Sequence, residues 1–251
     1  MLPERRNNRA LYSSGGQNDR RPGWTPIAVV AAAGTTTTPV ATCYRSAMST
    51  ALRKPRMTRE EFFDWAQAQD VRYEFDGFDP VAMTGGTANH SQITQNILVA
   101  LRVRLRGSDC RPLGPDAGVA TVGSAVRYPD ALVTCAKVRG DAQTIPGVVV
   151  VFEVLSPTSG RTDRIVKLRE YRAVGTIRCY VILEHSSVGL AVFSRRSEDE
   201  DWTARALTIE DTLQIPDIGI EIPVAELYEN VDLPETDAAA TIRVSDQQML
   251  R

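Results

Sequence analysis

The pattern of apolar and polar residues along this chain changes several times, and each change predicts a different element. Four valines and a phenylalanine occupy 148–152 without a break, directly after Pro146-Gly147. Such a run is typical of a strand that is buried on both faces. An apolar residue at every fourth position instead predicts a long helix over 88–106, with the repeat at Ile93, Ile97, Leu101 and Leu105.

Two further helices are predicted from their start signals. Thr58 and Glu61 have the spacing of a capping box, so a helix is expected to follow them. Thr162 follows a turn-forming segment at 156–160 and is the expected N-cap of a helix that ends near 173. Within that helix we expect Ile165 and Leu168 to face the core.

Strands are predicted on the remaining apolar stretches. They comprise a hairpin around 76–79, a meander through 110–135, strands at 177–184 and 188–194, and an edge strand with a short closing helix at 211–231. The chain contains no internal repeat. This order of elements predicts one α+β domain over 57–233.

The two ends of the chain differ in composition from this domain. Residues 1–56 are rich in Arg, Gly, Ser, Thr and Pro and can bury little apolar surface, so we expect them to be disordered. Arg20-Arg21 is similar to the start of a twin-arginine export signal, but two prolines break the short apolar stretch around it. A translation start at Met48 or Met57 is the simpler interpretation. The polar tail 234–251 is expected to be loose.

Two acidic residues interrupt the apolar strands and are the first candidates for chemistry. Glu153 directly follows the run at 148–152, and Asp130 lies among apolar residues just after Pro129. A buried carboxylate is strongly unfavourable unless a cation, a donor or water lies beside it. Lys167 lies about one and a half turns into a helix that begins near Glu153, so it can reach back towards the acids. Together these are the residue types that a metal-dependent phosphodiesterase needs.

Each candidate also has a purely structural interpretation, and the sequence leaves these alternatives open. Asp130 is also explained as a turn residue after proline. Lys167 is explained as an exposed partner of Asp163 at i,i+4. Glu74 fits a solvated strand as well as it fits a site. A histidine in the first turn of a helix, such as His90, is more often a local cap or surface residue than a group that contacts a phosphate or assists proton transfer.

The order of several short motifs resembles the Uma-two-type restriction endonucleases. The resemblance runs from about 57 to 233 and rests on YEF at 73–75, NH at 89–90, YPD at 128–130, FEVLSPTS at 152–159 and DRIVKLREYR at 163–172. It implies the PD-(D/E)XK nuclease fold, a mixed β-sheet flanked by α-helices with a metal site at the end of the sheet.

The resemblance also implies roles for individual residues. Asp130 and Glu153 match the two acids that bind Mg²⁺, for which Mn²⁺ is expected to substitute, and Glu74 matches a further acid from the N-terminal part. The lysine expected two residues after Glu153 is Leu155 here, so Lys167 is the candidate for that role. DNA is the implied substrate, and a homodimer is implied by the need to cut both strands.

Composition and charge add little to this picture. The formal net charge of −2 does not by itself indicate a nucleic-acid-binding protein. Basic residues nevertheless end one predicted helix, at Arg102, Arg104 and Arg106, and populate another, at Arg161, Arg164, Lys167, Arg169 and Arg172. Four cysteines, at 43, 110, 135 and 179, lack any metal-ligand spacing. We expect Cys135 and Cys179 to be small buried hydrophobic residues, all thiols to be reduced, and the protein to be cytoplasmic.

The sequence is therefore consistent with three hypotheses about function. The leading hypothesis is a Mg²⁺-dependent DNA endonuclease that uses Asp130, Glu153, Lys167 and Glu74. The second is a nucleic-acid-binding or interaction module that keeps the nuclease fold without turnover, because the lysine is absent at Leu155. The third is a metal-dependent hydrolase that acts on another substrate.

Overall fold

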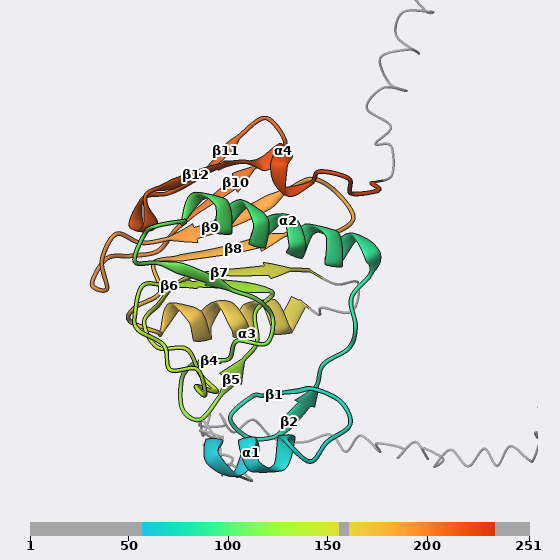
Figure 1. Cartoon of the computed structure of the whole chain (residues 1–251), viewed down its shortest axis with the longest axis vertical. Helices are drawn as coiled ribbons and strands as arrows, with labels where there is room; N and C mark the ends of the chain where they lie inside the picture. The colour runs from blue at the N-terminus through green and yellow to red at the C-terminus, as the bar shows by residue number, and fades with distance from the viewer. Residues whose placement is uncertain (1–56, 156–160, 234–251) are drawn as a thin grey trace, which may run out of the picture. The chain divides into compact units, whose positions relative to one another are not determined.

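A computed structural model of the chain describes residues 57–155 and 161–233 (Figure 1). The expected disordered segment 1–56, the turn at 156–160 and the loose tail 234–251 lie outside the described residues. In the part of the chain that is described, no helix has the length and apolar character needed to cross a membrane.

The main sheet has six strands in the order β10-β9-β8-β7-β6-β3. Strands β7 and β8 are parallel and the other neighbours are antiparallel, so the sheet is mixed. The strands are β3 (Arg111–Leu113), β6 (Ala131–Thr134), β7 (Val148–Val154), β8 (Cys179–Leu183), β9 (Leu190–Ser194) and β10 (Thr203–Leu207). The valine run is therefore an interior strand, as predicted, with neighbours on both sides.

Two helices cover opposite faces of this sheet, as Figure 1 shows. Helix α2 (Ala88–Arg104) packs its Ile93 and Ile97 against Phe152 of β7. Helix α3 (Arg161–Arg172) covers the other face, where Tyr171 packs against Val151. Successive side chains of a strand point to opposite faces, so only an uninterrupted apolar strand serves both helices.

A second, four-stranded sheet has the order β2-β1-β5-β4. Its strands are β1 (Tyr73–Phe75), β2 (Pro80–Ala82), β4 (Val119–Ala120) and β5 (Val126–Arg127). Helix α1 (Arg59–Ala66) begins at the predicted capping box of Thr58 and Glu61 and stacks Phe62 on Phe75, with ring centroids 5.1 Å apart. Glu74 lies on β1 and Arg127 on β5 of this small sheet.

The C-terminal elements close the face of the main sheet on which α2 lies. They are β11 (Thr212–Ile215), the short 3₁₀ helix η1 (Pro216–Ile218), β12 (Ile220–Pro223) and α4 (Val224–Leu227). Apolar residues of this hairpin, including Leu213 and Ile222, are fully buried in the same core as α2. The predicted single edge strand in this region is thus wrong, because two strands pair with each other.

Two other local predictions are also wrong. The meander expected through 110–135 is divided between the sheets, because β3 pairs with β6 while β4 pairs with β5. Ile165 is 59% exposed, whereas Leu168 is half-buried and Tyr171 is fully buried. Helix α3 therefore presents a different face to the sheet from the one predicted, and it starts at Arg161.

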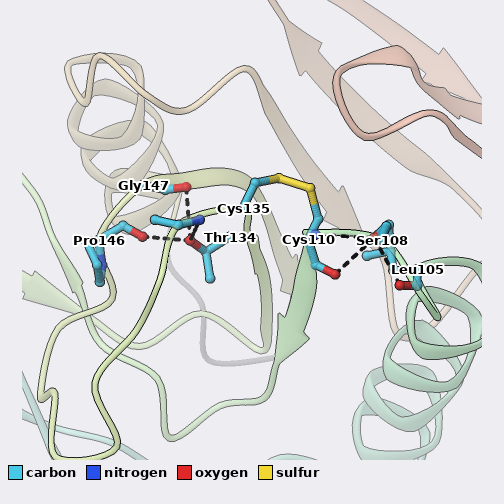
Figure 2. The surroundings of a disulfide bond; sticks show 8 residues. Leu105, Ser108, Cys110, Thr134, Cys135, Pro146 and Gly147 are labelled. Carbon is cyan, nitrogen blue, oxygen red and sulfur yellow. Dashed lines mark hydrogen bonds between the residues drawn. A yellow bond between two sulfur atoms is a disulfide. The ribbon is translucent and has the colours of Figure 1, made fainter.

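The cysteines differ from the predicted reduced state. Cys110 and Cys135 form a disulfide (Figure 2), and Cys135 is exposed, whereas Cys179 is buried as predicted. Strand pairing explains the bridge, since the β3–β6 ladder places Arg111 opposite Thr134 and so brings the preceding and following residues together. The expected cytoplasmic location loses the support of reduced thiols, and Cys43 lies outside the described residues.

The predicted fold class is confirmed. The described residues form an α+β fold in which a mixed sheet is flanked by helices on both faces. The C-terminal end of β7 lies where α3 and the second sheet also meet. The candidate residues lie there.

Candidate functional site

Asp130 and Glu153 lie opposite each other at the shared end of β6 and β7. The ladder pairs Ala131 with Phe152, so its continuation by one residue sets Asp130 across from Glu153. Oδ2 of Asp130 accepts a hydrogen bond of 2.7 Å from the backbone N–H of Val154, which ties the two strand ends together. The two acids predicted to act as a pair are therefore brought to one position in the sheet.

The carboxylate of Glu153 is buried and held at both oxygens. Tyr171 donates its hydroxyl to Oε1 at 2.9 Å, and Nζ of Lys167 lies 3.4 Å from Oε2. Burial raises the pKa of Glu153 to about 7, and the nearby charges of Asp130 and Glu74 act in the same direction. Lys167 and Tyr171 lower the pKa of Glu153 but offset this rise only in part.

Lys167 reaches back from α3 to the strand ends. Its Nζ lies 3.4 Å from Glu74 Oε1 and 3.4 Å from Glu153 Oε2, and its side chain is largely buried. The interpretation of Lys167 as an exposed helical residue is thus excluded. Leu155, which occupies the usual lysine position, is buried in the apolar cluster below α3.

Glu74 enters the site from the second sheet. Arg127 donates from Nη1 to its Oε2 at 3.2 Å, and the backbone N–H of Tyr128 donates to Oε1 at 3.1 Å. Glu74 is only 7% exposed. The interpretation of this residue as a solvated strand position is therefore excluded, and the structure brings it within reach of Lys167.

Arg127 also contacts Glu170, and neither of these two residues was predicted to belong to the site. Arg127 donates two hydrogen bonds to Glu170, from Nε to Oε2 at 2.7 Å and from Nη2 to Oε1 at 2.8 Å. Thr121 adds a hydrogen bond of 3.2 Å to the same carboxylate. Although burial opposes it, the contact with Glu170 raises the pKa of Arg127, so this guanidinium is always charged.

His90 contacts the other side of Asp130. Its Nε2 lies 3.3 Å from Oδ1 of Asp130, and the hydrogen bond between them raises the pKa of His90 against the opposing effect of burial. The cap of α2 is provided by Thr87, whose side chain accepts from the backbone N–H of His90. The imidazole is thus directed at the acid, and the interpretation of His90 as a simple cap is excluded.

The balance of charge tests whether a divalent cation suits this position. Among the described side chains of the site, four carboxylates face two cations, Arg127 and Lys167; the acids are Glu74, Asp130, Glu153 and Glu170. Two of the acids, Asp130 and Glu153, offer hard oxygen atoms at one strand end. Mg²⁺ is commonly held by one or two carboxylates and keeps several waters, so this donor set fits it.

The described residues nevertheless form no preformed cage of protein ligands. No group of three or more His, Cys, Asp or Glu side chains within the described ranges is arranged to hold a metal ion. Each oxygen of Asp130 and Glu153 instead has a protein partner, as given above. A cation that binds here therefore has to compete with His90 and Lys167 for these oxygens.

Sequence reasoning missed three contributors to the site. Arg127 gave one signal, a charged residue next to the apolar strand residue Val126, and Glu170 and Tyr171 lie three and four residues after Lys167 on the same helix. The four-residue spacing puts Tyr171 on the same helix face as Lys167, but spacing does not indicate that its hydroxyl meets Glu153. Only the strand order brings Glu74 and Arg127 to α3.

Comparisons with known proteins find a matching family and a related sequence. The model of one family, Uma2, described as "Putative restriction endonuclease", matches residues 59–225, which is more than half of the chain. The uncharacterized protein slr1290 of Synechocystis sp. (strain ATCC 27184 / PCC 6803 / Kazusa) is 29% identical over 176 residues, which are 69% of this chain and 92% of that protein.

The fold also has a counterpart among solved structures. The crystal structure of a putative nuclease belonging to DUF820 from Anabaena variabilis superposes with a TM-score of 0.55 at 13% sequence identity. The match covers 68% of this chain and 97% of that one. At this low identity, the likeness shows a common fold.

Proposed function

This chain belongs to the Uma2 family, and we propose from this premise that it is a Mg²⁺-dependent endonuclease that hydrolyses phosphodiester bonds in DNA. One observation carries the proposal. Four side chains converge at the joined ends of β6 and β7: Glu74 from β1, Asp130 from the residue before β6, Glu153 from β7 and Lys167 from α3. The burial of several charged groups in one place is unfavourable for folding, because each group loses its hydration. A role in chemistry is the best explanation for such a cluster.

In this proposal, Asp130 and Glu153 hold the divalent cation. When it is bound, the cation stabilises negative charge that develops on the phosphoryl oxygens. Tyr171 fixes one oxygen of Glu153, so that the carboxylate keeps one orientation. Mn²⁺ is expected to replace Mg²⁺, because both ions favour carboxylate and water ligands.

Lys167 supplies the positive charge of the protein at the reaction centre. Its ammonium group donates to the attacking water or to a phosphoryl oxygen of the substrate. Glu74 orients the amine from one side, at 3.4 Å, and is itself held by Arg127. His90 orients Asp130 through the contact at 3.3 Å, and its imidazole, whose pKa this contact raises, is a further group able to exchange protons.

A nicking assay tests this function. We expect purified protein to nick supercoiled plasmid in the presence of Mg²⁺ or Mn²⁺ and to stop in EDTA. Asp130→Asn and Lys167→Met are each expected to lower the rate by about 100-fold or more. Asp199→Asn and Lys137→Met change the same residue types at exposed positions away from the site and are expected to cut normally. Nicking that survives in the two site variants would contradict the proposal.

A second candidate function is a binding module without turnover. The specific observation in its favour is that every oxygen of Asp130 and Glu153 already has a protein partner. Fluorescence anisotropy with a labelled duplex decides between the two functions. Binding that is unaffected by metal, with no cutting under any condition, would favour the module.

Two further expectations belong to the endonuclease proposal and are measured separately. A homodimer would allow both strands to be cut, and sedimentation velocity on the full chain measures its mass. A cytoplasmic location stays a prediction, and fractionation of the native cells measures it.

A further inference from the structure

The disulfide between Cys110 and Cys135 (Figure 2) lies beside β3, the edge strand of the main sheet, and none of the candidate site residues takes part in it. Cys110 directly precedes the edge strand β3, and Cys135 directly follows β6. Cys135 is exposed and Cys110 is half-buried. Small thiols in solution can therefore reach this bridge without any unfolding of the domain.

The backbone around both cysteines is held independently of the bridge. Ser108 donates its hydroxyl to the carbonyl of Cys110 at 3.1 Å and accepts from the N–H of Cys110 at 3.2 Å. On the other strand, the hydroxyl of Thr134 donates to the carbonyl of Pro146 at 2.6 Å. Together with the β3–β6 ladder, these contacts keep the two sulfur atoms close when the bond is open, so that the bond can form again without a rearrangement of the backbone.

A cavity of about 400 Å³ lies beside Cys110, and the charged side chains that line it are all positive. Three arginines line it and no acidic residue does; its lining residues are Arg102, Leu105, Arg106, Gly107, Ser108, Cys110, Arg111 and Pro112. Guanidinium groups bind carboxylates and other planar anions through paired N–H donors. A ligand that carries one or two carboxylates is therefore the class that this cavity favours.

We propose that this cavity binds a small anionic thiol and directs it to the sulfur of Cys110. The thiolate attacks Sγ of Cys110, the bond to Cys135 breaks, and its electron pair leaves on Sγ of Cys135, which takes a proton from water. The product is a mixed disulfide on Cys110 and a free thiol at Cys135. A second thiol of the same kind releases Cys110 as a thiol and leaves as a disulfide with the first.

The position of the cavity decides which sulfur is modified. Cys110 lines the cavity and Cys135 does not. A bound thiol thus meets Cys110 first, and the arginines then hold the carboxylates of the attached group. This step is independent of the endonuclease proposal, because none of the residues around the cavity contributes to the candidate site.

The proposal is tested by comparing thiols of different charge on the full chain. Reduction of the bridge is followed with glutathione, which is anionic, with 2-mercaptoethanol, which is neutral, and with cysteamine, which is cationic, each rate being corrected for its thiolate fraction. We expect a preference for glutathione that falls about 5-fold in Arg102→Gln/Arg106→Gln. A matched variant, Arg139→Gln/Arg196→Gln, removes the same charge outside the cavity and is expected to keep the preference.

Two measurements do not depend on the variants. The preference for glutathione should weaken in 0.5 M NaCl, because exposed charges are screened at high salt. Peptide mass spectrometry after acid quenching should find the mixed disulfide on Cys110. Equal corrected rates for the three thiols, or a mixed disulfide found on Cys135, would overturn the proposal.

Discussion

The carboxyl group of Glu153 shows at the scale of one residue how this site opposes stability. Its ordinary pKa is 4.5, and burial first, then the neighbouring acids, raise the pKa to about 7 in the folded protein. A carboxyl group with a raised pKa stabilises the fold fully below the ordinary value and loses that contribution as pH rises to the folded value. The free energy of unfolding should therefore fall by about 3 kcal/mol between pH 4.5 and 7 because of this group.

Glu153→Gln removes this titration while it keeps a polar side chain of the same size. We expect the variant to be more stable than the parent above pH 7 in EDTA, and the gap to close below pH 5. Urea unfolding at several pH values measures it, and the difference between the two proteins cancels the titration of all other groups. If the two curves run parallel across this range, then Glu153 is not a buried carboxyl group with a raised pKa.

Arg127 is the buried cation that pairs with two of the acids of the site. It joins Glu74 to Glu170 within the protein interior, with only 3% of its surface exposed. Arg127→Met leaves both carboxylates without this partner, so we expect a loss of about 3–5 kcal/mol in the free energy of unfolding. The double variant Arg127→Met/Glu170→Met removes one of the stranded acids and should regain part of that loss. A single variant as stable as the parent would contradict the buried network.

Helix α3 combines these contacts at the scale of an element. Lys167, Glu170 and Tyr171 lie within about one turn of it. Lys167 and Tyr171 both contact Glu153 on β7 of the main sheet, and Glu170 accepts from Arg127 on β5 of the second sheet. The helix therefore couples both sheets at one point. A small rotation of α3 would separate all three contacts together.

Tyr171→Phe tests this arrangement through a single hydroxyl group. The ring stays packed against Val151 and Tyr180, so the fold should keep most of its stability, while Glu153 loses a hydrogen bond of 2.9 Å. We expect metal-dependent nicking to fall roughly 10-fold, in line with the loss of a hydrogen bond to a charged group. Tyr73→Phe on β1 is the matched control. Unchanged nicking in Tyr171→Phe would mean that the hydroxyl group does not position Glu153.

The elements that sequence predicts well are those with strong local signals. The valine run, the repeat of α2 and the capping box of Thr58 each depend on neighbouring residues, and all three are confirmed. The face of α3 was predicted less well, because Ile165 and Leu168 are equally apolar. Their exposure depends on where Tyr171 fits between the strands, which periodicity cannot show.

The site was only partly predictable for a related reason. Asp130, Glu153 and Lys167 interrupt or follow apolar segments, so their sequence surroundings already marked them. Arg127 and Glu170 meet across 43 residues, and the two cysteines meet across 25. Such pairs depend on strand order, which local spacing does not determine.

At the scale of the whole molecule, the Cys110–Cys135 bridge joins β3 to β6 at the edge of the main sheet. It closes a loop of the chain that contains β4, β5 and Asp130. A cross-link over about 25 residues lowers the entropy of the unfolded chain and is expected to contribute about 3 kcal/mol. Cys110→Ser/Cys135→Ser should therefore lower the free energy of unfolding by that amount under oxidising conditions. Under reducing conditions the parent and the double variant should unfold alike, and Cys179→Ser provides a control for thiol loss elsewhere. Equal stability of the oxidised parent and the double variant would show that the bridge does not restrain the unfolded chain.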